Sequence, residues 1–497
     1  MTGKGRFLAF DLGAESGRAV LGSISRGKLA LEEVHRFPNR PVQTLERLNW
    51  DVLRLFAEIK TALAKAASNG SRLDGIGVNT WGIDHALLDK KGELLANPYC
   101  YRDPRTSGMM EKVFARMPKE EIFEITGIQF MPLNTLYQLY ATWEATPELV
   151  AQAGTMFLVP DLFNYWLTGR KVSERTIAST TQLFDARRRT WSKPIFDRLG
   201  LPFDILADIV PPGTVLGSLL PAVVSEVGLE GVPVIAPACH DTAGAVAAVP
   251  MGAEPSVHIS SGTWSTLGAE IVQPCITPAS LEYNFTNEAS AGGRYMFRKN
   301  IMGLWLIQEC RRTWAEAGRA YEYTDLAEMA EKAEPFGAMV EVDHASFLQP
   351  GDMPARIADF CRETGQQPPE DHAAFARCVF ESLALKYRWV LEKLEECLEM
   401  HADVIHIVGG GSRNRLLCRL TAGATGRPVL SGPDEASSSG NVLMQAMGRG
   451  LLDSAEEARD LIRRSFDLAS YEPRDTERWD EHYCRFLEIK ESSTTLL

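Results

Sequence analysis

The sequence has no long apolar run. None of its 497 residues lies in a stretch that reaches the roughly 20 apolar residues of a membrane-spanning helix. The opening run Phe7-Leu8-Ala9-Phe10 follows a cationic start, but Asp11 interrupts it before it is long enough for a signal peptide. We therefore expect a cytoplasmic protein that has no membrane partner.

The chain is also poor in basic residues. Its 52 lysines and arginines are outnumbered by 65 acidic residues, which gives a formal net charge of -13. Proteins that read a phosphate backbone concentrate Lys and Arg, so this balance argues against a nucleic-acid partner. It does not argue against a nucleotide, because a few oriented donors in a cleft can hold a phosphate whatever the total charge is.

Cysteine pairs with metal-binding spacing are missing too. The nine cysteines are scattered, without a CxxC pair or a Cys/His pattern typical of zinc. Most are expected to be buried thiols in a reducing compartment. Cys361 and Cys378 bracket a loop that holds Pro368-Pro369 and could come together where the chain enters the next helix. Two unrelated thiols is the commoner outcome in a cytosol, so a disulfide here is one hypothesis of two.

Two nucleotide-binding fingerprints are absent. The chain contains no GxxxxGK[ST] segment, which excludes the P-loop class as the route to phosphate binding. The triplet Gly409-Gly410-Gly411 does not fit the pattern GxGxxG followed by an acidic residue about 20 positions later. This argues against a nicotinamide cofactor and against a sugar dehydrogenase.

What is present favours two large α/β domains. A chain of 497 residues is too long for one core of ordinary size, and 45% apolar and 24% charged residues are typical of a globular protein. The order of strand, helix and strand in the first half predicts a sheet covered by helices. The expected elements are strands at 6–11, 18–23, 32–37, 76–78 and 86–89, and a helix at 50–67.

The pattern of strand, small-polar turn and strand recurs half a chain later. Strands at 256–259 and 266–271 flank the turn Ser260-Ser261-Gly262-Thr263-Trp264-Ser265, and two hairpins that face each other across a cleft would explain the recurrence. We place the boundary near Pro250, which gives domains of residues 1–247 and 248–497. The second half should also contain helices at 373–400, 414–424 and 437–451 and a strand at 404–408.

Three turns have the composition of a phosphate or nucleotide site. In the turn after the first strand, glycines let backbone N–H groups approach an anion, Ser16 adds a hydroxyl, and Asp11 can hold Mg²⁺ through water. The turn at 260–265 offers four hydroxyls, and the glycine triplet at 409–411 suits an adenosine. Each turn alone is better explained as an ordinary turn, but the pairing of the two hairpins favours phosphate binding.

Asp241 is the candidate base. The segment 238–245 joins an apolar strand at 232–236 to small residues that can begin a closely packed helix. An aspartate there is either a helix N-cap, which is the commoner case, or a base. Its place beside His240, where a substrate can come close, favours the base, since phosphoryl transfer to a hydroxyl needs a group that accepts the proton.

Five segments, in this order along the whole chain, resemble the motifs of the FGGY carbohydrate kinases. The resemblance implies an actin-like ATPase fold of α/β class, with two ribonuclease-H-like domains and with ATP and a sugar meeting in the cleft between them. The segments are Asp11-Leu12-Gly13-Ala14, Thr80-Trp81-Gly82-Ile83-Asp84, His240-Asp241-Thr242-Ala243, Ser261-Gly262-Thr263-Trp264-Ser265 and Gly409-Gly410-Gly411.

Further segments resemble the branch of this family that phosphorylates L-rhamnulose at its C1 hydroxyl in rhamnose catabolism, with ATP and Mg²⁺. Another ketose, such as L-fuculose or D-xylulose, stays open, and so does a non-catalytic sugar or nucleotide sensor with the same fold. The segments are Tyr101-Arg102-Asp103, Gly127-Ile128-Gln129-Phe130 with Asn134-Thr135-Leu136-Tyr137-Gln138, Lys299-Asn300-Ile301-Met302-Gly303-Leu304-Trp305, and Gly432-Pro433 followed by Glu435-Ala436 and Gly440-Asn441.

The resemblance also implies roles for single residues, with Asp241 as the catalytic base. The implied sugar contacts are Gly82, His240, Asp241, Thr242 and Asn300, and the implied nucleotide contacts are Ala14, Glu15, Ser16, Gly17, Arg18, Thr263, Gln308 and Gly410. Two positions depart from the family pattern. Glu15 lies in the phosphate loop and must face solvent or metal to avoid the phosphates, and Asn79 stands where some relatives have Asp.

Overall fold

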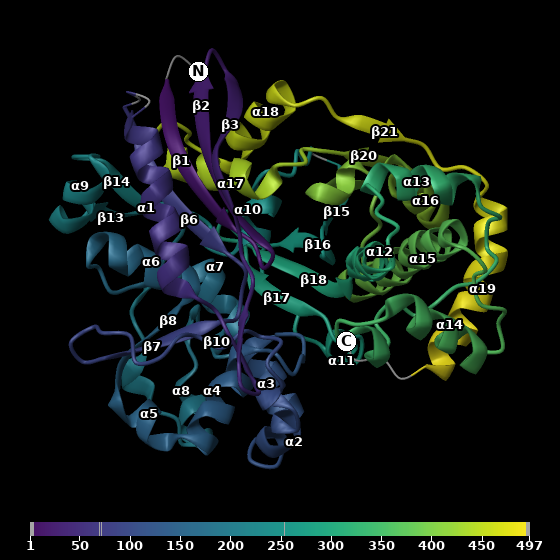
Figure 1. The fold of residues 1–497 in the computed structure, drawn as a ribbon, viewed down its shortest axis with the longest axis horizontal. Helices are drawn as coiled ribbons and strands as arrows, with labels where there is room; N and C mark the ends of the chain where they lie inside the picture. Colours follow the sequence, from purple (N-terminus) through teal and green to yellow (C-terminus); the bar gives the residue numbers. More distant parts are fainter. Residues whose placement is uncertain (1–3, 69, 71, 253, 494–497) are drawn as a thin grey trace.

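Two mixed β-sheets with helices on their faces form the molecule (Figure 1). The computed structural model describes residues 4–68, 70, 72–252 and 254–493. The strand order of the first sheet is β13 (Thr214–Ser218), β14 (Pro233–Ala236), β6 (Gly75–Thr80), β1 (Gly5–Leu12), β2 (Ser16–Ser25) and β3 (Lys28–Pro38). The order of the second sheet is β17 (Thr286–Ala289), β18 (Tyr295–Met302), β16 (Trp264–Ile271), β15 (Ser256–Ser261), β19 (Val404–Val408), β20 (Val429–Ser431) and β21 (Ala469–Tyr471).

The two sheets repeat one strand pattern. In the first, β1, β2 and β3 form an antiparallel meander, β6 and β14 continue in parallel beyond β1, and β13 closes the edge antiparallel. In the second, β15, β16 and β18 form the meander, β19 and β20 continue in parallel beyond β15, and β21 closes the edge antiparallel. The predicted recurrence of the hairpin is therefore confirmed as a repeat of topology.

Helices cover these sheets where the apolar spacing predicts them. The helix expected at 50–67 is α1 (Val52–Ser68), and it buries Leu55, Ile59 and Leu63 completely because residues four apart share one face. Asp51 precedes it and accepts a hydrogen bond from the backbone N–H of Arg54 at 3.0 Å. Packing on the sheets also involves α6 (Val159–Thr168), α15 (His372–Leu398) and α16 (Arg415–Thr425).

Two late helices return to the first sheet. α17 (Ala436–Gly448) packs on β1 and β6, and α18 (Ala455–Ser465) packs on β3, so these two late helices lie beside the purple strands at the beginning of the chain (Figure 1). Side-chain amides fix α17 there: Asn441 donates to Asn79 Oδ1 at 2.6 Å, and Gln445 donates to Asn441 Oδ1 at 2.7 Å. The division into 1–247 and 248–497 stays a prediction, and residues of the second unit complete the packing of the first sheet.

A smaller layer lies between β6 and β14 in the sequence, beside the first sheet. Its strand β7 (His85–Asp89) pairs with β8 (Ala153–Leu158), so the strand predicted at 86–89 belongs to a separate two-stranded sheet. This layer also brings the segment around Gln129 to the second sheet, where β17 and β18 lie. Its helices are α2 (Met109–Phe114), α3 (Lys119–Thr126), α4 (Thr135–Ala145), α5 (Pro147–Gln152), α7 (Arg175–Ala178) and α8 (Lys193–Leu199).

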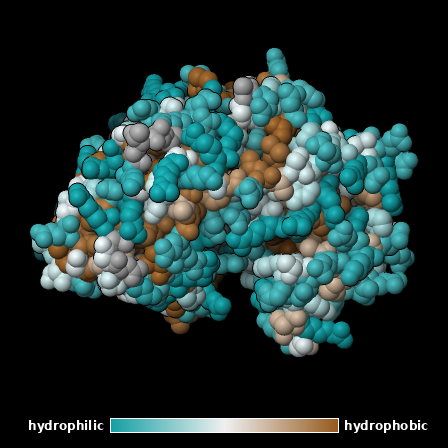
Figure 2. All heavy atoms as spheres, turned by 90° about the horizontal axis from the view of Figure 1, so that it is seen from above, coloured by the Kyte–Doolittle hydropathy of each residue, from teal (hydrophilic) through white to brown (hydrophobic). Residues whose placement is uncertain are grey.

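The remaining helices lie mostly around the second sheet. They are α9 (Pro221–Val227), α10 (Asp241–Ala247), α11 (Pro278–Glu282), α12 (Trp305–Glu316), α13 (Tyr323–Lys332), α14 (Met353–Glu363) and α19 (Thr476–Ser492). Within the described residues, no helix combines the length and the apolar character that are needed to span a membrane. Seen from above, the surface is largely hydrophilic and is hollowed between its two lobes (Figure 2).

The two cysteines considered for a disulfide are both free thiols. Cys361 lies on α14 and Cys378 on α15, and both are buried. Burial raises the pKa of the Cys361 thiol to about 11. The structure therefore supports the alternative of two separate thiols.

Candidate active site

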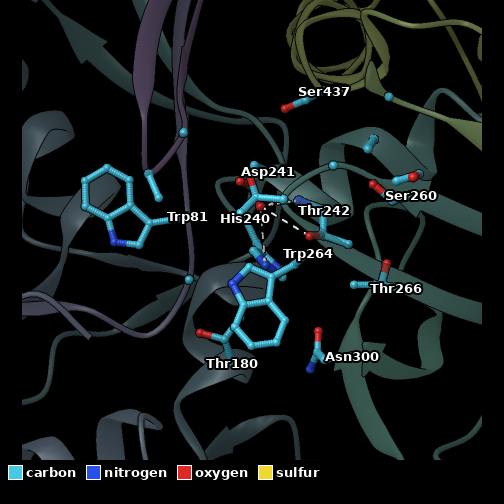
Figure 3. Close-up of a pocket in the computed structure, with 18 of the residues that line it drawn as sticks. Trp81, Thr180, His240, Asp241, Thr242, Ser260, Trp264, Thr266, Asn300 and Ser437 are labelled. Atoms are coloured by element: carbon cyan, nitrogen blue, oxygen red, sulfur yellow. Dashed lines mark hydrogen bonds and ion pairs between the residues drawn. The ribbon is translucent and has the colours of Figure 1, made fainter. Parts of the chain in front are cut away.

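A cavity of about 550 Å³ opens where the turns of the two hairpins face the start of α10 (Figure 3). Most of the residues that the sequence predicts for the site line this cavity. They are Asp11, Ala14, Glu15, Ser16, Arg18, Gly82, His240, Asp241, Thr242, Thr263, Asn300 and Gly410. Segments separated by up to about 400 positions in the sequence thus meet at one place, as predicted.

Gly17 and Gln308 do not line the cavity. A Cβ at Gly17 would come within 2.3 Å of the Phe37 ring, so the packing of β2 on β3 requires this glycine. Gln308 lies in the first turns of α12, and its Oε1 is buried without a hydrogen-bond partner in the described part of the chain. A nucleotide contact stays a prediction for both residues.

Both hairpin turns are held by backbone hydrogen bonds. The N–H of Gly13 donates to Ser16 O at 3.0 Å, and Asn39 Nδ2 donates to Gly13 O at 2.8 Å. In the second turn the N–H of Gly262 donates to Trp264 O at 2.9 Å. The strands extend further than the sequence predicts, so only Gly262 and Thr263 form that turn. Glu15 is exposed, as its place in the phosphate loop requires.

The backbone before the candidate base is fixed by a buried carboxylate. Glu174 Oε2 accepts a hydrogen bond from Cys239 N at 3.0 Å, and Thr176 Oγ1 accepts one from His240 N at 3.2 Å. Glu174 also caps the short helix α7 through Thr176 N at 2.8 Å. These contacts tie the strand end that carries His240 to the smaller layer of the first half.

Asp241 begins α10, and its carboxylate lies at the cavity (Figure 3). The N-cap position belongs to His240, so the alternative of Asp241 as the N-cap is wrong. Oδ1 of Asp241 accepts a hydrogen bond from Thr242 N at 2.6 Å, and the side chain keeps 30% of its exposure. Burial raises the pKa of Asp241, while His240 lowers it and Asp11 raises it again, so the net shift favours a carboxyl group that takes up a proton.

The wall opposite Asn300 is organised by the fully buried carboxylate of Asp84. Its oxygens accept hydrogen bonds from Trp50 Nε1 at 2.6 Å, Trp81 Nε1 at 2.9 Å and Gln138 Nε2 at 2.8 Å. The backbone N–H of Tyr101 donates a fourth at 3.2 Å. Burial raises the pKa of Asp84 to about 6, and these donors oppose the rise. Trp81 and Tyr101 both line the cavity, so Asp84 holds the side chain of one lining residue and the backbone of the other.

Ile83, between Gly82 and Asp84, has a backbone φ of 68°. A β-branched residue rarely adopts this left-handed conformation, and such residues cluster at functional sites. Hydrogen bonds from both sides hold it: its N–H donates to Thr180 Oγ1 at 3.2 Å, and its carbonyl accepts from Thr135 Oγ1 at 2.5 Å. The strained residue and Thr180 both line the cavity.

The glycine triplet contains two kinds of position. A Cβ at Gly411 would lie 2.1 Å from Ser261 Oγ, so Gly411 is required by packing, whereas a Cβ at Gly410 would meet open space at the cavity. The triplet does not begin the next helix directly, because a 3₁₀ turn intervenes and Asn414 caps α16 by accepting from Leu417 N at 3.0 Å. Gly410 thus presents bare backbone to the cavity.

Comparison with known families decides which class of protein carries this site. Residues 6–247 match the N-terminal domain of the FGGY family of carbohydrate kinases, and residues 257–449 match the C-terminal domain of the same family. The chain belongs to the FGGY family of carbohydrate kinases. The family predicted from the sequence motifs is therefore confirmed.

Curated relatives of this FGGY kinase cover almost its whole length. It is 43% identical to the rhamnulokinase of Oceanobacillus iheyensis over 93% of this chain and 97% of that protein. It is 42% identical to the rhamnulokinase of Bacteroides thetaiotaomicron over 97% of this chain and 99% of that protein.

Solved structures of other FGGY sugar kinases share its fold. A gluconate kinase and a xylulose kinase from Lactobacillus acidophilus superpose with TM-scores of 0.81 and 0.80 at 16% identity, covering 99% and 98% of this chain and 98% of each of theirs. The glycerol kinase of Plasmodium falciparum superposes with a TM-score of 0.79 at 14% identity, covering 99% of both chains. The predicted two-domain α/β fold is confirmed.

In this FGGY kinase the carboxylate of Asp11 is already surrounded by donors. Oδ2 accepts from Arg18 Nη2 at 2.8 Å and Ser438 Oγ at 3.3 Å, and Oδ1 accepts from Asn79 Nδ2 at 3.1 Å and Ser437 Oγ at 2.8 Å. An aspartate at position 79 would place a second carboxylate against Asp11, so the amide fits better here. Direct metal ligation does not fit this donor set, whereas contact through a metal-bound water leaves these bonds in place.

Several residues of the cavity were not predicted as site residues, among them three that carry charge or an amide. Glu288 lies on β17, Arg298 on β18 and Gln129 in the smaller layer, and all three line the cavity. Gln129 lies inside one of the segments that resemble the family branch, which was a usable signal. Glu288 and Arg298 meet only because β17 pairs with β18, and a strand register of this kind leaves no local pattern.

Proposed function

We propose that this FGGY kinase transfers the γ-phosphoryl group of ATP to the C1 hydroxyl of L-rhamnulose and releases L-rhamnulose 1-phosphate and ADP. The observation that carries the proposal is the identity of 42% and 43%, over nearly the full length, with proteins named rhamnulokinase. The arrangement of the cavity supports it, because the carboxylate of Asp241, the amide of Asn300 and the turns of the two hairpins surround one space.

In the proposed reaction Asp241 is the general base. The C1 oxygen of the sugar attacks the γ-phosphorus, the bond to the bridging oxygen of ADP breaks, and the hydroxyl proton passes to Asp241. His240, Thr242, Asn300 and the backbone at Gly82 bind the sugar. Thr242 donates only to Oδ1 of Asp241, which leaves Oδ2 to take the proton of the hydroxyl.

The opposite wall of the cavity binds the nucleotide in this proposal. The turns that carry Ser16 and Thr263 offer backbone N–H and hydroxyl donors to the phosphates, Arg18 adds positive charge, and Gly410 lets the adenosine approach the backbone. Mg²⁺ would be held through water by Asp11 and would neutralise charge on the phosphates. We further propose that the domains divide at residues 247 and 248, which the limits of the two family matches support.

A panel of ketoses tests the substrate. The purified protein is incubated with ATP, Mg²⁺ and L-rhamnulose, L-fuculose or D-xylulose, and ADP release is measured. We expect the highest kcat/KM with L-rhamnulose. A higher value with either other ketose assigns a different substrate, and no ADP release with any sugar favours a non-catalytic sensor.

A further inference from the structure

The imidazole of His240 lies between two carboxylates from different halves of the chain. Its Nδ1 is 3.2 Å from Glu288 Oε2, an ion-pair contact that lies outside hydrogen-bond geometry, and its Nε2 is 3.5 Å from Asp241 Oδ1. His240 is 5% exposed and Glu288 is 4% exposed, so water has little access to the Nδ1 side of the ring. The Nε2 separation is longer than a charge-assisted hydrogen bond, which leaves the Asp241 oxygens free of the ring.

Arg298 keeps Glu288 in its ionised form. Its Nη2 donates to Glu288 Oε2 at 2.6 Å, and its side chain is 3% exposed. Burial alone would raise the pKa of Glu288, but Arg298 and His240 bring it down to about 2. An ionised carboxylate attracts a ring hydrogen and repels a ring lone pair, and Glu288 is the closer and the more buried of the two carboxylates, so it draws the hydrogen of the ring to Nδ1.

That attraction selects one tautomer of the neutral ring. A neutral imidazole carries one ring hydrogen, and if Nδ1 holds it, Nε2 presents a lone pair towards the cavity beside Asp241. A sugar hydroxyl can then donate to Nε2 while a neighbouring hydroxyl gives its proton to Asp241. In this arrangement the ring orients the sugar and does not compete for the base.

The same guanidinium also orients the sugar-binding amide. Arg298 Nη1 donates to Asn300 Oδ1 at 2.7 Å, and Asn300 Nδ2 donates to Gln129 Oε1 at 3.0 Å. Asn300 Nδ2 also lies 3.7 Å from Met131 Sδ, so the amide is held in one orientation, with one acceptor site of Oδ1 left for the sugar. Figure 3 shows His240, Asp241 and Asn300 around one part of the cavity.

We propose that Glu288, held by Arg298, is a positioning residue that keeps the hydrogen of His240 on Nδ1 and its Nε2 lone pair available to a sugar hydroxyl beside Asp241. The proposal rests on the proposed function, in which Asp241 is the base and His240 contacts the sugar. Carboxylates that fix the tautomer of a functional histidine act in this way in metal sites and in catalytic triads.

Glu288→Gln tests the proposal, because it keeps the shape and removes the charge. Arg298 has only donors, so it turns the glutamine oxygen towards itself and the NH₂ group towards His240 Nδ1. The ring hydrogen then moves to Nε2. We expect kcat/KM for L-rhamnulose to fall by roughly 10- to 100-fold, the usual effect of losing such a partner, while KM for ATP stays within about twofold.

Two further measurements separate positioning from general damage. Glu270→Gln is the matched control, since Glu270 lies on β16 of the same sheet, is ion-paired with Arg459 and does not line the cavity. We expect wild-type kinetics for it. The ¹⁵N shifts of the histidine rings, assigned with His240→Gln, should report Nδ1–H in the wild type and Nε2–H in Glu288→Gln.

The outcomes separate a failure of the role of Glu288 from a failure of the proposed function. A wild-type ring that carries a hydrogen on Nε2 overturns the role of Glu288, even if the variant fails to fold. An active wild type with unchanged sugar kinetics in Glu288→Gln also overturns that role and leaves the proposed function standing. A wild type that releases no ADP with any ketose overturns the proposed function and, with it, this role of Glu288.

Discussion

Polar side chains in this site make most of their hydrogen bonds to other protein groups. Only their remaining donor and acceptor positions are available to a ligand in the cavity. Asn300 uses its Oδ1 for Arg298 and one N–H for Gln129. Asp11 has both oxygens occupied by donors. Such satisfied groups keep their orientation before a ligand binds, which lowers the cost of ordering the site.

Residues in continuous motifs could be predicted, whereas residues joined by strand pairing could not. Asp241 and Thr263 belong to short segments whose glycines and hydroxyls signal a turn. Glu288 and Arg298 carry no such signal, because their meeting depends on the register of β17 with β18. Gly17 illustrates the reverse case: its motif suggested a phosphate contact, and its packing against Phe37 explains the glycine instead.

Lys299, the buried cation next to Asn300 on β18, predicts a pH dependence of stability. Its Nζ donates to the carbonyl of Tyr283 at 3.0 Å. Burial and then Lys386 lower its pKa to about 7, against the opposing effects of Asp343 and Glu341. Between pH 7 and the ordinary value of 10.5 the unfolded chain binds more protons than the folded one, so the free energy of unfolding should rise with pH.

Lys299→Met removes this contribution. Urea unfolding at pH 7 and pH 9 measures the free energy of unfolding of the wild type and of the variant. The value for the wild type minus the value for the variant should increase with pH, by at most about 1.4 kcal/mol per pH unit. Lys193→Met, at an exposed position, is the control and should keep the wild-type slope. Parallel slopes for the wild type and Lys299→Met would contradict the assignment.

At the scale of elements, the two hairpins are the most regular feature. The apolar pattern predicted β1, β2, β15 and β16. The recurrence of strand, small-polar turn and strand predicted that the two hairpins face each other across a cleft. The exact turn was not predicted: Trp264 and Ser265 already belong to β16 and pair with β18, so Thr263 lies at the tip of a tight turn. Its carbonyl accepts from Trp305 N at 3.1 Å, which anchors the tip to α12.

Thr263→Ala should weaken the use of ATP more than the binding of the sugar. The hydroxyl is proposed to donate to a phosphate, and a hydrogen bond to a charged group contributes about 1.5–3 kcal/mol, so KM for ATP should rise roughly tenfold or more. KM for the sugar should stay within about twofold of the parent value. Thr263→Ser keeps the hydroxyl and should restore ATP use. Equal changes for both substrates would count against a phosphate contact.

At the scale of the whole molecule, the chain crosses back to complete its first sheet. Val442 on α17 packs where Gly22 has no side chain, since a Cβ at Gly22 would lie 2.4 Å from a Val442 methyl. Asn441 satisfies the carbonyls of Phe10 and Gly77 at 3.3 and 3.2 Å. The length of the chain and the recurrence of the hairpin pattern predicted two domains. A contact between residues about 360 positions apart or more leaves no local pattern in a single sequence, so the return of α17 to the first sheet could not be predicted.

Residues 1–247 expressed alone should therefore fold poorly. Without α17 the first sheet exposes the apolar face around Phe7 and Ala9 and leaves amide and carbonyl groups without partners. We expect aggregation or strong binding of a hydrophobic dye, compared with the full chain as the control. A monomeric fragment with a cooperative melting transition would show that α17 is dispensable for this sheet.

Asp241→Asn is the measurement that tests the account most directly. Asparagine keeps the shape of the side chain at the start of α10 but cannot take the proton, so ADP release with L-rhamnulose should fall by roughly 10²- to 10⁴-fold. Calorimetry should still detect sugar binding, and the melting temperature should stay near that of the parent protein. An Asp241→Asn variant that turns over L-rhamnulose at the parent rate would contradict the assignment of Asp241 as the base.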